Sequence, residues 1–316
     1  RENGYSGENL WHTVANSAEG LGGEVLSGWS MRNVQYPARV DKKHSETAFM
    51  TDRAMQVIEE LDDNPWCLHL SYIKPHWPYM ASDPYHALYS TEDIIPAIRS
   101  DRELLDRHPV VSAFGYHEES INFSRDECRK RVIPAYMGLI SELDFHIGRL
   151  IDFLKIRGDL DNTVIVLTSD HGDYLGDHWL GEKELFYESA IRIPLIVINP
   201  DKRAEKTRGT SNESFVESID LLPTFLDLVG CQESYDHRLE GRSLLENLKD
   251  PNLISRTNAF SRYTNGDMYI SDNYAYSEWK YSEEGKVIGR MLYDMKNEPQ
   301  TENNINTNFF ILVNFL

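Results

Sequence analysis

The chain has 316 residues, of which 41% are hydrophobic and 11% aromatic, so it can bury a sizeable core and is too apolar for a disordered protein. Its 32 Lys and Arg residues are outnumbered by 51 Asp and Glu residues, which gives a net charge of −19. This charge argues against nonspecific nucleic-acid binding, and it repels an anionic substrate unless a bound cation reverses the field locally.

Cysteine spacing and the chain ends carry little information about compartment. Cys67, Cys128 and Cys231 are widely separated, so neither a disulfide framework nor a zinc motif is expected. Cys67 lies in an apolar run and is expected to be buried. The chain begins at Arg1 without an initiator Met or a signal-peptide core, so we expect the native N-terminus to be missing. Localisation therefore stays open between cytoplasm and periplasm or exterior.

Hydrophobic periodicity predicts helices alternating with strands along most of the chain. In chain order the expected elements are a helix over 44–61, a strand over 66–73, a helical insertion over 90–128, a helix over 133–154, strands over 163–169 and 194–198, and a helix over 218–229. Gly158 and Gly230 are expected to end the two helices that precede them.

The order of these elements predicts the fold class and the domains. Nearly all-apolar strands between helices are typical of an α/β fold with a mostly parallel sheet flanked by helices. Beyond residue 256, short aromatic runs around 268–270, 274–281 and 290–293 predict antiparallel strands. We therefore expect an α/β domain over 1–255 and a smaller C-terminal antiparallel α+β subdomain over 256–316. The apolar end, 309–316, is too short to span a bilayer.

The strongest candidate site follows the strand over 163–169. That strand ends in Asp170, His171 and Gly172, and ligands in open α/β sheets bind at the carboxyl ends of strands. Neighbouring residues of a strand point to opposite faces, so Asp170 and His171 can share one ion only if the backbone turns, which Gly172 permits. A carboxylate and a neutral imidazole suit a divalent metal.

Two further residues have chemistry that fits an anionic ester. Lys183 follows a glycine-containing loop that leaves the proposed metal site, and it could bind the oxygens of a phosphate or sulfate group. His76 stands between two prolines in a stiff loop and could protonate a leaving-group oxygen. Lys74, close to His76, could add positive charge.

Several stretches of the sequence together resemble one enzyme family. They are the proline-histidine loop over 73–89, a helix over 136–149, the dense motif over 168–183 with its continuation through 187–188 and 191–197, and the segments 218–226, 240–244 and 292–295. In this order they resemble the sulfatase and phosphonate monoester hydrolase family of the alkaline phosphatase superfamily. The resemblance covers roughly residues 44–300 and implies an alkaline-phosphatase-like fold.

The resemblance also implies roles for the candidate residues. Asp170 matches a metal-ligand aspartate, and His171 stands where phosphonate monoester hydrolases have a ligand histidine and many sulfatases have asparagine. Lys183 matches the lysine that contacts the transferred group, and His76 matches the histidine near the leaving group. The implied cofactors are one divalent ion, Ca, Mn or Mg, and a formylglycine nucleophile. The histidine at 171 favours the phosphonate and phosphodiester branch slightly over the sulfatase branch.

One departure from the family is decisive for activity. The family's nucleophile motif, C/S-x-P/A-x-R, does not occur in this chain. In the family this motif and an acidic metal-binding pair precede the region where this chain begins. We therefore expect a truncated chain that contains half of the metal site, lacks the nucleophile and is inactive alone. We also expect it to be poorly stable unless another segment completes it.

The sequence predicts a hydrolase of sulfate esters or of phosphonate and phosphate esters, and two alternatives stay open. The first is a pseudoenzyme or binding protein that lacks the nucleophile. The second is a two-zinc phosphodiesterase of the same superfamily, although the D-x-x-x-H motif that it needs is absent. The expected partner is a small anionic ester, with no nucleic acid and no membrane. The oligomeric state stays open, and a homo-oligomer is one of the options.

Overall fold

The computed structural model describes residues 15–105, 107–231, 239–280 and 286–305. The chain divides into two units. Unit 1 comprises the described residues of 1–96 and 122–161, and unit 2 those of 97–121 and 162–316. The expected subdomain boundary at residue 255 falls inside unit 2 and stays a prediction.

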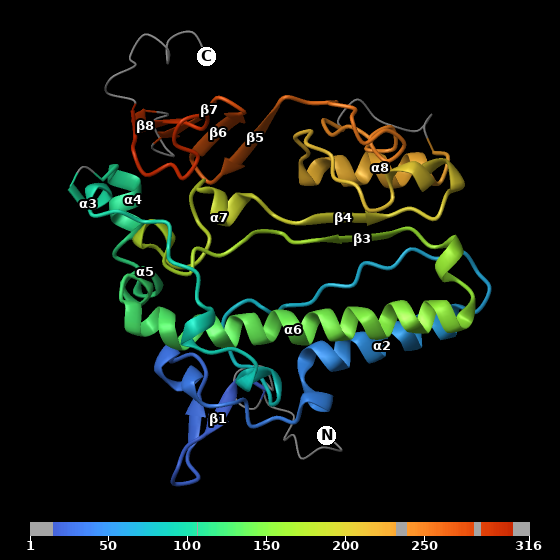
Figure 1. The fold of residues 1–316 in the computed structure, drawn as a ribbon, viewed down its shortest axis with the longest axis horizontal. Helices are drawn as coiled ribbons and strands as arrows, with labels where there is room; N and C mark the ends of the chain where they lie inside the picture. Colours follow the sequence, from blue (N-terminus) through green and yellow to red (C-terminus); the bar gives the residue numbers. More distant parts are fainter. Residues whose placement is uncertain (1–14, 106, 232–238, 281–285, 306–316) are drawn as a thin grey trace. The chain divides into compact units, whose positions relative to one another are not determined.

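Unit 1 is built on two packed helices, α2 (Glu46–Leu61) and α6 (Asp126–Arg157), which run side by side (Figure 1). The Ser45 hydroxyl caps α2 by accepting a hydrogen bond from the backbone N–H of Ala48 at 3.1 Å. Helix α6 ends at Gly158, whose φ of 84° gives the left-handed cap that favours glycine. The helices predicted over 44–61 and 133–154 are therefore confirmed.

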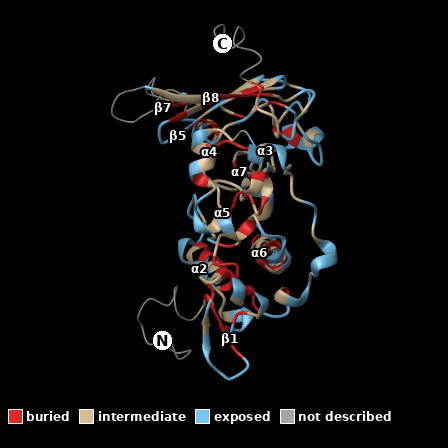
Figure 2. Cartoon of the chain, turned by 90° about the vertical axis from the view of Figure 1, so that its left-hand side faces the viewer, coloured by how far each residue is buried: buried red, intermediate tan, exposed pale blue. Residues whose placement is uncertain are grey.

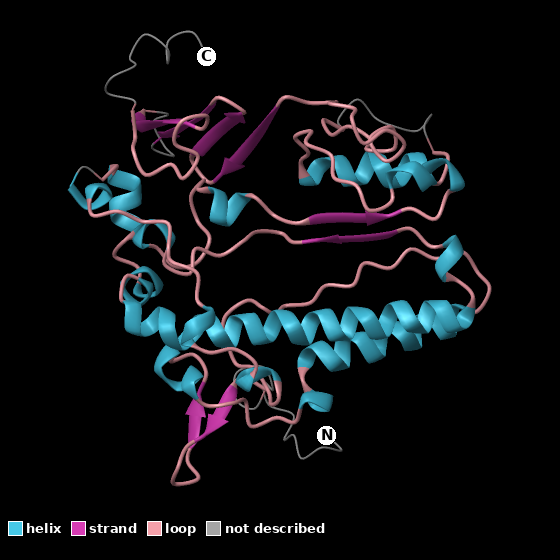
Figure 3. Cartoon of the chain, in the orientation of Figure 1, coloured by secondary structure: helices cyan, strands magenta, loops and turns pink. Residues whose placement is uncertain are grey.

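The remainder of unit 1 contains the hairpin of β1 (Ser17–Glu19) and β2 (Val25–Ser27), which pair antiparallel (Figure 3). Single 3-10 turns connect the other segments at Met31–Gln35, Lys42–His44, Tyr85–Ala87 and Thr91–Asp93.

The prediction of a strand over 66–73 is wrong, because this segment is extended but pairs with no strand of its unit among the described residues. The segment alternates between half-buried residues such as Leu68 and Tyr72 and exposed residues such as Cys67 and Ile73, as an extended chain does. Within the described residues of unit 1, however, no strand pairs with it. The predicted burial of Cys67 is also wrong. Alternate residues of an extended chain point to opposite faces, and Cys67 lies on the exposed face.

The insertion predicted over 90–128 is confirmed as helical. It contains the short helices α3 (Arg102–Leu105), α4 (Pro109–Phe114) and α5 (Glu118–Phe123) (Figure 1). Pro109 occupies the first turn of α4, where a missing N–H costs nothing, and the His108 side chain accepts a hydrogen bond from the Val110 N–H at 3.3 Å.

In unit 2, β3 (Ile165–Thr168) and β4 (Leu195–Ile198) pair with each other. Helix α7 (Glu188–Ile191) lies between them in the sequence, and α8 (Leu221–Leu228) follows. These elements confirm the predicted strands and the predicted helix over 218–229. The expected parallel pairing is wrong for this pair, which is antiparallel. A continuous apolar run indicates a buried strand but does not fix the direction of its neighbour.

A four-stranded antiparallel meander completes unit 2. Its strands are β5 (Asn258–Tyr263), β6 (Gly266–Ser271), β7 (Tyr274–Lys280) and β8 (Val287–Asp294), paired in that order. Buried and half-buried residues alternate along β6 and β7. Figure 2 colours the chain by burial. The buried face, including Met268, Trp279 and Met291, forms one core with Tyr174, Leu180 and Tyr187. The sheet therefore supports the loop that carries Lys183.

The expectation for residues 309–316 lies outside the described residues. Among those that the structure describes, no helix combines the length and the apolar character that a membrane span requires.

Candidate active site

Asp170 and His171 converge directly after β3. The Nε2 atom of His171 lies 3.5 Å from Oδ2 of Asp170. The Nδ1 atom of His171 lies 2.7 Å from the carbonyl oxygen of Gly172, and because a carbonyl only accepts, Nδ1 carries the hydrogen. The lone pair is then on Nε2, the nitrogen nearer the carboxylate. Such a second hydrogen bond fixes the tautomer and orientation of histidines that bind metals.

Gly172 is required here for a different reason from the predicted one. Its φ is not in the left-handed region. Instead, a Cβ at this position would lie 2.0 Å from the carbonyl oxygen of Ser189, and the Gly172 N–H donates to the Ala190 carbonyl at 2.7 Å. The strand end therefore packs directly on the backbone of α7, and only glycine fits.

Lys183 lies on a strained loop. Between residues 175 and 185, five residues other than glycine have positive φ: Leu175, His178, Trp179, Glu182 and Leu185. Left-handed backbone is unfavourable for residues with a Cβ, and such strain concentrates at functional sites. The Lys183 ammonium lies 2.9 Å from the Glu182 carboxylate, and the Lys183 side chain is 29% exposed.

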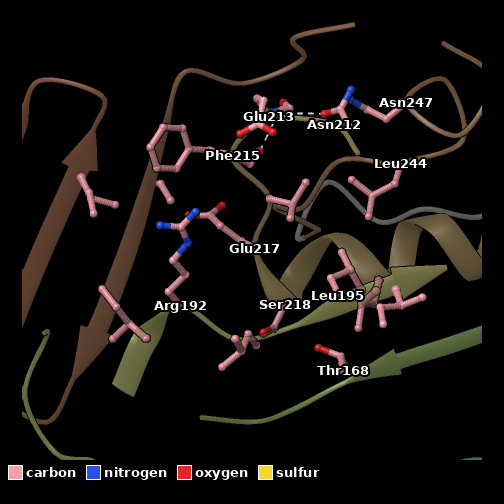
Figure 4. A pocket seen from close by; sticks show the side chains of 18 of the residues that line it. Thr168, Arg192, Leu195, Asn212, Glu213, Phe215, Glu217, Ser218, Leu244 and Asn247 are labelled. Atoms are coloured by element: carbon pink, nitrogen blue, oxygen red, sulfur yellow. Dashed lines mark hydrogen bonds between the residues drawn. The ribbon is translucent and has the colours of Figure 1, made fainter. Parts of the chain in front are cut away.

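Asp170, His171 and Lys183 line the same cavity, which has a volume of about 1530 Å³ within unit 2. Figure 4 shows the part of its wall where Thr168 ends β3 and Leu195 begins β4. The structure thus brings three of the four predicted residues to one opening.

His76 belongs to unit 1. Its Nδ1 donates to the carbonyl of Trp77 at 2.7 Å, the same arrangement as in His171. Lys74, which the sequence offered as additional positive charge near His76, is buried, with 7% of its surface exposed. Its ammonium donates to Asn16 Oδ1 at 2.7 Å and to the carbonyl of Pro78. Lys74 therefore ties together the two ends of the loop that carries His76, and burial lowers the pKa of Lys74 to about 8.

The described residues fit part of a metal site. Asp170 and His171 offer one carboxylate and one imidazole nitrogen, a donor set that suits a divalent ion. Within the described ranges, no group of three or more His, Cys, Asp or Glu side chains could hold a metal ion. Further ligands would have to come from elsewhere.

Sequence reasoning missed the buried polar contacts beneath the loop. His178 Nδ1 lies 2.7 Å from Oε2 of Glu103, with side chains 3% and 8% exposed. Arg107 donates to the backbone carbonyl of His178 at 2.6 Å. Glu103 and His178 are 75 positions apart, and no sequence pattern connects them. The one available signal is that His178 belongs to the dense motif over 168–183.

Comparison with known families and proteins gives matches over nearly the whole chain. The Sulfatase family model matches residues 2–231, and the model for the C-terminal region of N-sulphoglucosamine sulphohydrolase matches residues 176–310. The multifunctional alkaline phosphatase superfamily protein PehA of Trinickia caryophylli is 37% identical over 221 residues, which cover 66% of this chain and 42% of that protein. An arylsulfatase of Clostridium perfringens is 24% identical over 288 residues, covering 86% of this chain and 56% of the relative.

Among solved structures, the phosphonate monoester hydrolase of Silicibacter pomeroyi superposes with a TM-score of 0.81 at 25% identity. The match covers 99% of this chain and 64% of that protein. The alkaline-phosphatase-like α/β fold is therefore confirmed. This chain spans about half the length of the curated relatives that it matches. Since the Sulfatase model covers more than half of the sequence, the chain belongs to the sulfatase family.

Proposed function

We propose that the full-length protein carrying this chain is a metal-dependent hydrolase of sulfate esters or of phosphonate and phosphate esters. The observation that carries the proposal is the shared cavity of Asp170, His171 and Lys183, with the His171 ring nitrogen directed toward the Asp170 carboxylate. The sulfatase family membership and a relative named arylsulfatase support a sulfate ester, whereas the phosphonate monoester hydrolase neighbour supports a phosphonate. The substrate is then a small anionic ester.

In this proposal each residue has a separate task. Asp170 and His171 would hold one divalent ion, Ca, Mn or Mg, which supplies Lewis-acid stabilisation of the transferred group when bound. Lys183 offsets negative charge on the oxygens of that group. His76 donates a proton or a hydrogen bond to the departing oxygen. A divalent ion held there would also offset, within the cavity, the repulsion that a net charge of −19 exerts on an anionic substrate.

The nucleophile in this proposal is a formylglycine outside this chain, since no C/S-x-P/A-x-R motif occurs within it. The chain alone is then inactive. Attack by the formylglycine at sulfur or phosphorus would break the bond to the departing alcohol oxygen, and release of the covalently held group would follow as a second, separate step.

The test uses the full-length protein with 4-nitrophenyl sulfate and 4-nitrophenyl phenylphosphonate as chromogenic substrates. Asp170→Ala and Lys183→Ala should each lower kcat/KM by at least about 100-fold, the scale of losing one preorganised charge stabiliser. Lys249→Ala is the matched control, because Lys249 also pairs with a neighbouring carboxylate, Glu246 at 2.6 Å, but does not line the cavity. Wild-type turnover in either site variant would end the assignment. An inactive wild type would favour the pseudoenzyme.

A further inference from the structure

One buried residue holds the backbone on both sides of Lys183. The N–H of Tyr174 donates to the carbonyl of Glu182 at 2.9 Å, and the Tyr174 hydroxyl donates to the carbonyl of Glu184 at 2.6 Å. Tyr174 is 1% exposed. Burial raises the pKa of Tyr174 well above its ordinary value, so the hydroxyl keeps its proton and remains a donor.

Tyr174 is itself held by a stack of buried side chains. Its ring meets Tyr187 edge to face, with centroids 6.1 Å apart, and Tyr187 stacks on His178 with centroids 3.9 Å apart and planes 13° apart. The 2.7 Å contact between His178 and Glu103 ends the series. A continuous set of contacts thus runs from α3 to the residue that brackets Lys183.

The backbone conformation explains why such support is needed. Glu182 and Leu185, close to Lys183 on either side, have φ of 67° and 80°. Left-handed conformations persist at residues with a Cβ only where their surroundings hold them. Without the two bonds from Tyr174, the segment would relax and carry the Lys183 ammonium away from its position.

We propose that Tyr174 is a positioning residue for Lys183, and that the Glu103–His178 pair fixes Tyr174 through Tyr187. This inference rests on the proposed function, because it assumes that Lys183 contacts the transferred group. It predicts that a substitution that breaks one of these contacts lowers kcat/KM only when Lys183 is present.

The experiment is a double-mutant cycle in the full-length protein, with 4-nitrophenyl sulfate and 4-nitrophenyl phenylphosphonate as substrates. Tyr174→Phe removes the hydroxyl and should lower kcat/KM about 10- to 100-fold, the scale of a displacement of about 1 Å. In the Lys183→Ala background the same change should alter kcat/KM less than about 2-fold, because residues that act through one another are not additive. Should Tyr174→Phe fail to fold, His178→Asn serves instead. Asparagine tolerates the left-handed φ of 53° at this position, while the ring stacked on Tyr187 is lost.

Tyr276→Phe is the control. Tyr276 is a half-buried phenol of unit 2 whose hydroxyl bonds Glu278 and Arg290, each at 3.1 Å, and no member of the series from Glu103 to Tyr174, so its kcat/KM should stay within about 2-fold of wild type. Unchanged turnover in folded Tyr174→Phe would overturn the inference. So would an equal loss with and without Lys183, since that indicates a general structural effect. Full activity in Lys183→Ala alone would instead defeat the proposed function.

Discussion

Unit 2 contains two carboxylate–imidazole pairs in opposite environments. Asp170 and His171 lie 3.5 Å apart at the end of β3, with side chains 86% and 30% exposed. Glu103 and His178 lie 2.7 Å apart with side chains 8% and 3% exposed. The first pair is loosely associated and lines the cavity. The second pair is closely hydrogen-bonded and buried, with Tyr187 stacked on the His178 ring and Arg107 bonded to the His178 carbonyl.

The difference shows that residue type alone does not identify a ligand site. Both pairs combine a carboxylate with a histidine of the same sequence motif. The Glu103 carboxylate is buried, and its two oxygens already accept hydrogen bonds from His178 and the Ser100 N–H, so a solvated ion cannot reach it, whereas the exposed Asp170 carboxylate is accessible. The exposed pair is therefore the candidate for chemistry, and the buried pair the candidate for support.

The largest expected effect separates the two pairs by stability. Glu103→Ala leaves the buried His178 ring and the Ser100 N–H without their acceptor, so the free energy of unfolding should fall by about 3 kcal/mol, the upper end for unsatisfied buried donors. Asp170→Ala removes an exposed carboxylate and should change it by less than about 0.5 kcal/mol. Urea denaturation of both variants measures this, with wild type as reference. Equal losses in the two variants would erase the distinction.

A smaller effect is expected from the backbone beneath the exposed pair. Gly172→Ala pushes a methyl group against the Ser189 carbonyl and should cost about 1–3 kcal/mol, as overpacking does. Gly148→Ala is the control, because nothing lies within 4 Å of a Cβ there and the residue is inside α6. Alanine should stabilise that helix by about 0.5–1 kcal/mol. Melting curves that rank the two variants the other way would contradict the packing account of Gly172.

The smallest effect extends the comparison to a third acid, the half-buried Glu46 in unit 1. Burial raises the pKa of Glu46 to about 7, and the charge of Lys74 only partly opposes this. The folded state therefore binds this proton more tightly than the unfolded state, so the associated stability is present below about pH 4.5 and is lost as pH rises through about 7.

Glu46→Gln removes that titration. Relative to wild type, the variant should gain about 1 kcal/mol of unfolding free energy between pH 4.5 and 7, after allowance for partial exposure. Lys74 stays charged over this range, because its own lowered pKa is about 8. Chemical denaturation at several pH values checks the slope. A constant difference between variant and wild type would show that Glu46 ionises normally.

Local patterns in the sequence predicted the elements well. The period of the apolar residues predicted α2 and α6, and Gly158 ends α6 as expected. The position of Asp170 and His171 after an apolar strand predicted their convergence. These features depend on neighbours in sequence, which periodicity reads directly.

The failures concern contacts between distant residues. The segment over 66–73 has the alternation of a strand but no partner among the described residues of its unit. The direction of β4 against β3 depends on the connection between them, and the Glu103–His178 pair joins positions 75 apart. Composition and local spacing contain no information about which distant residues pair, so these contacts are seen only in the three-dimensional structure.

The left-handed residues around Lys183 have a consequence for protein engineering. Each holds conformational energy on the order of 1 kcal/mol that glycine or asparagine would release. A screen for heat resistance would thus favour replacements at half-buried positions such as Leu175, whose φ is 48°. The same replacements would loosen the loop that carries Lys183. Selection for thermal tolerance and selection for turnover would therefore act in opposite directions on this short segment.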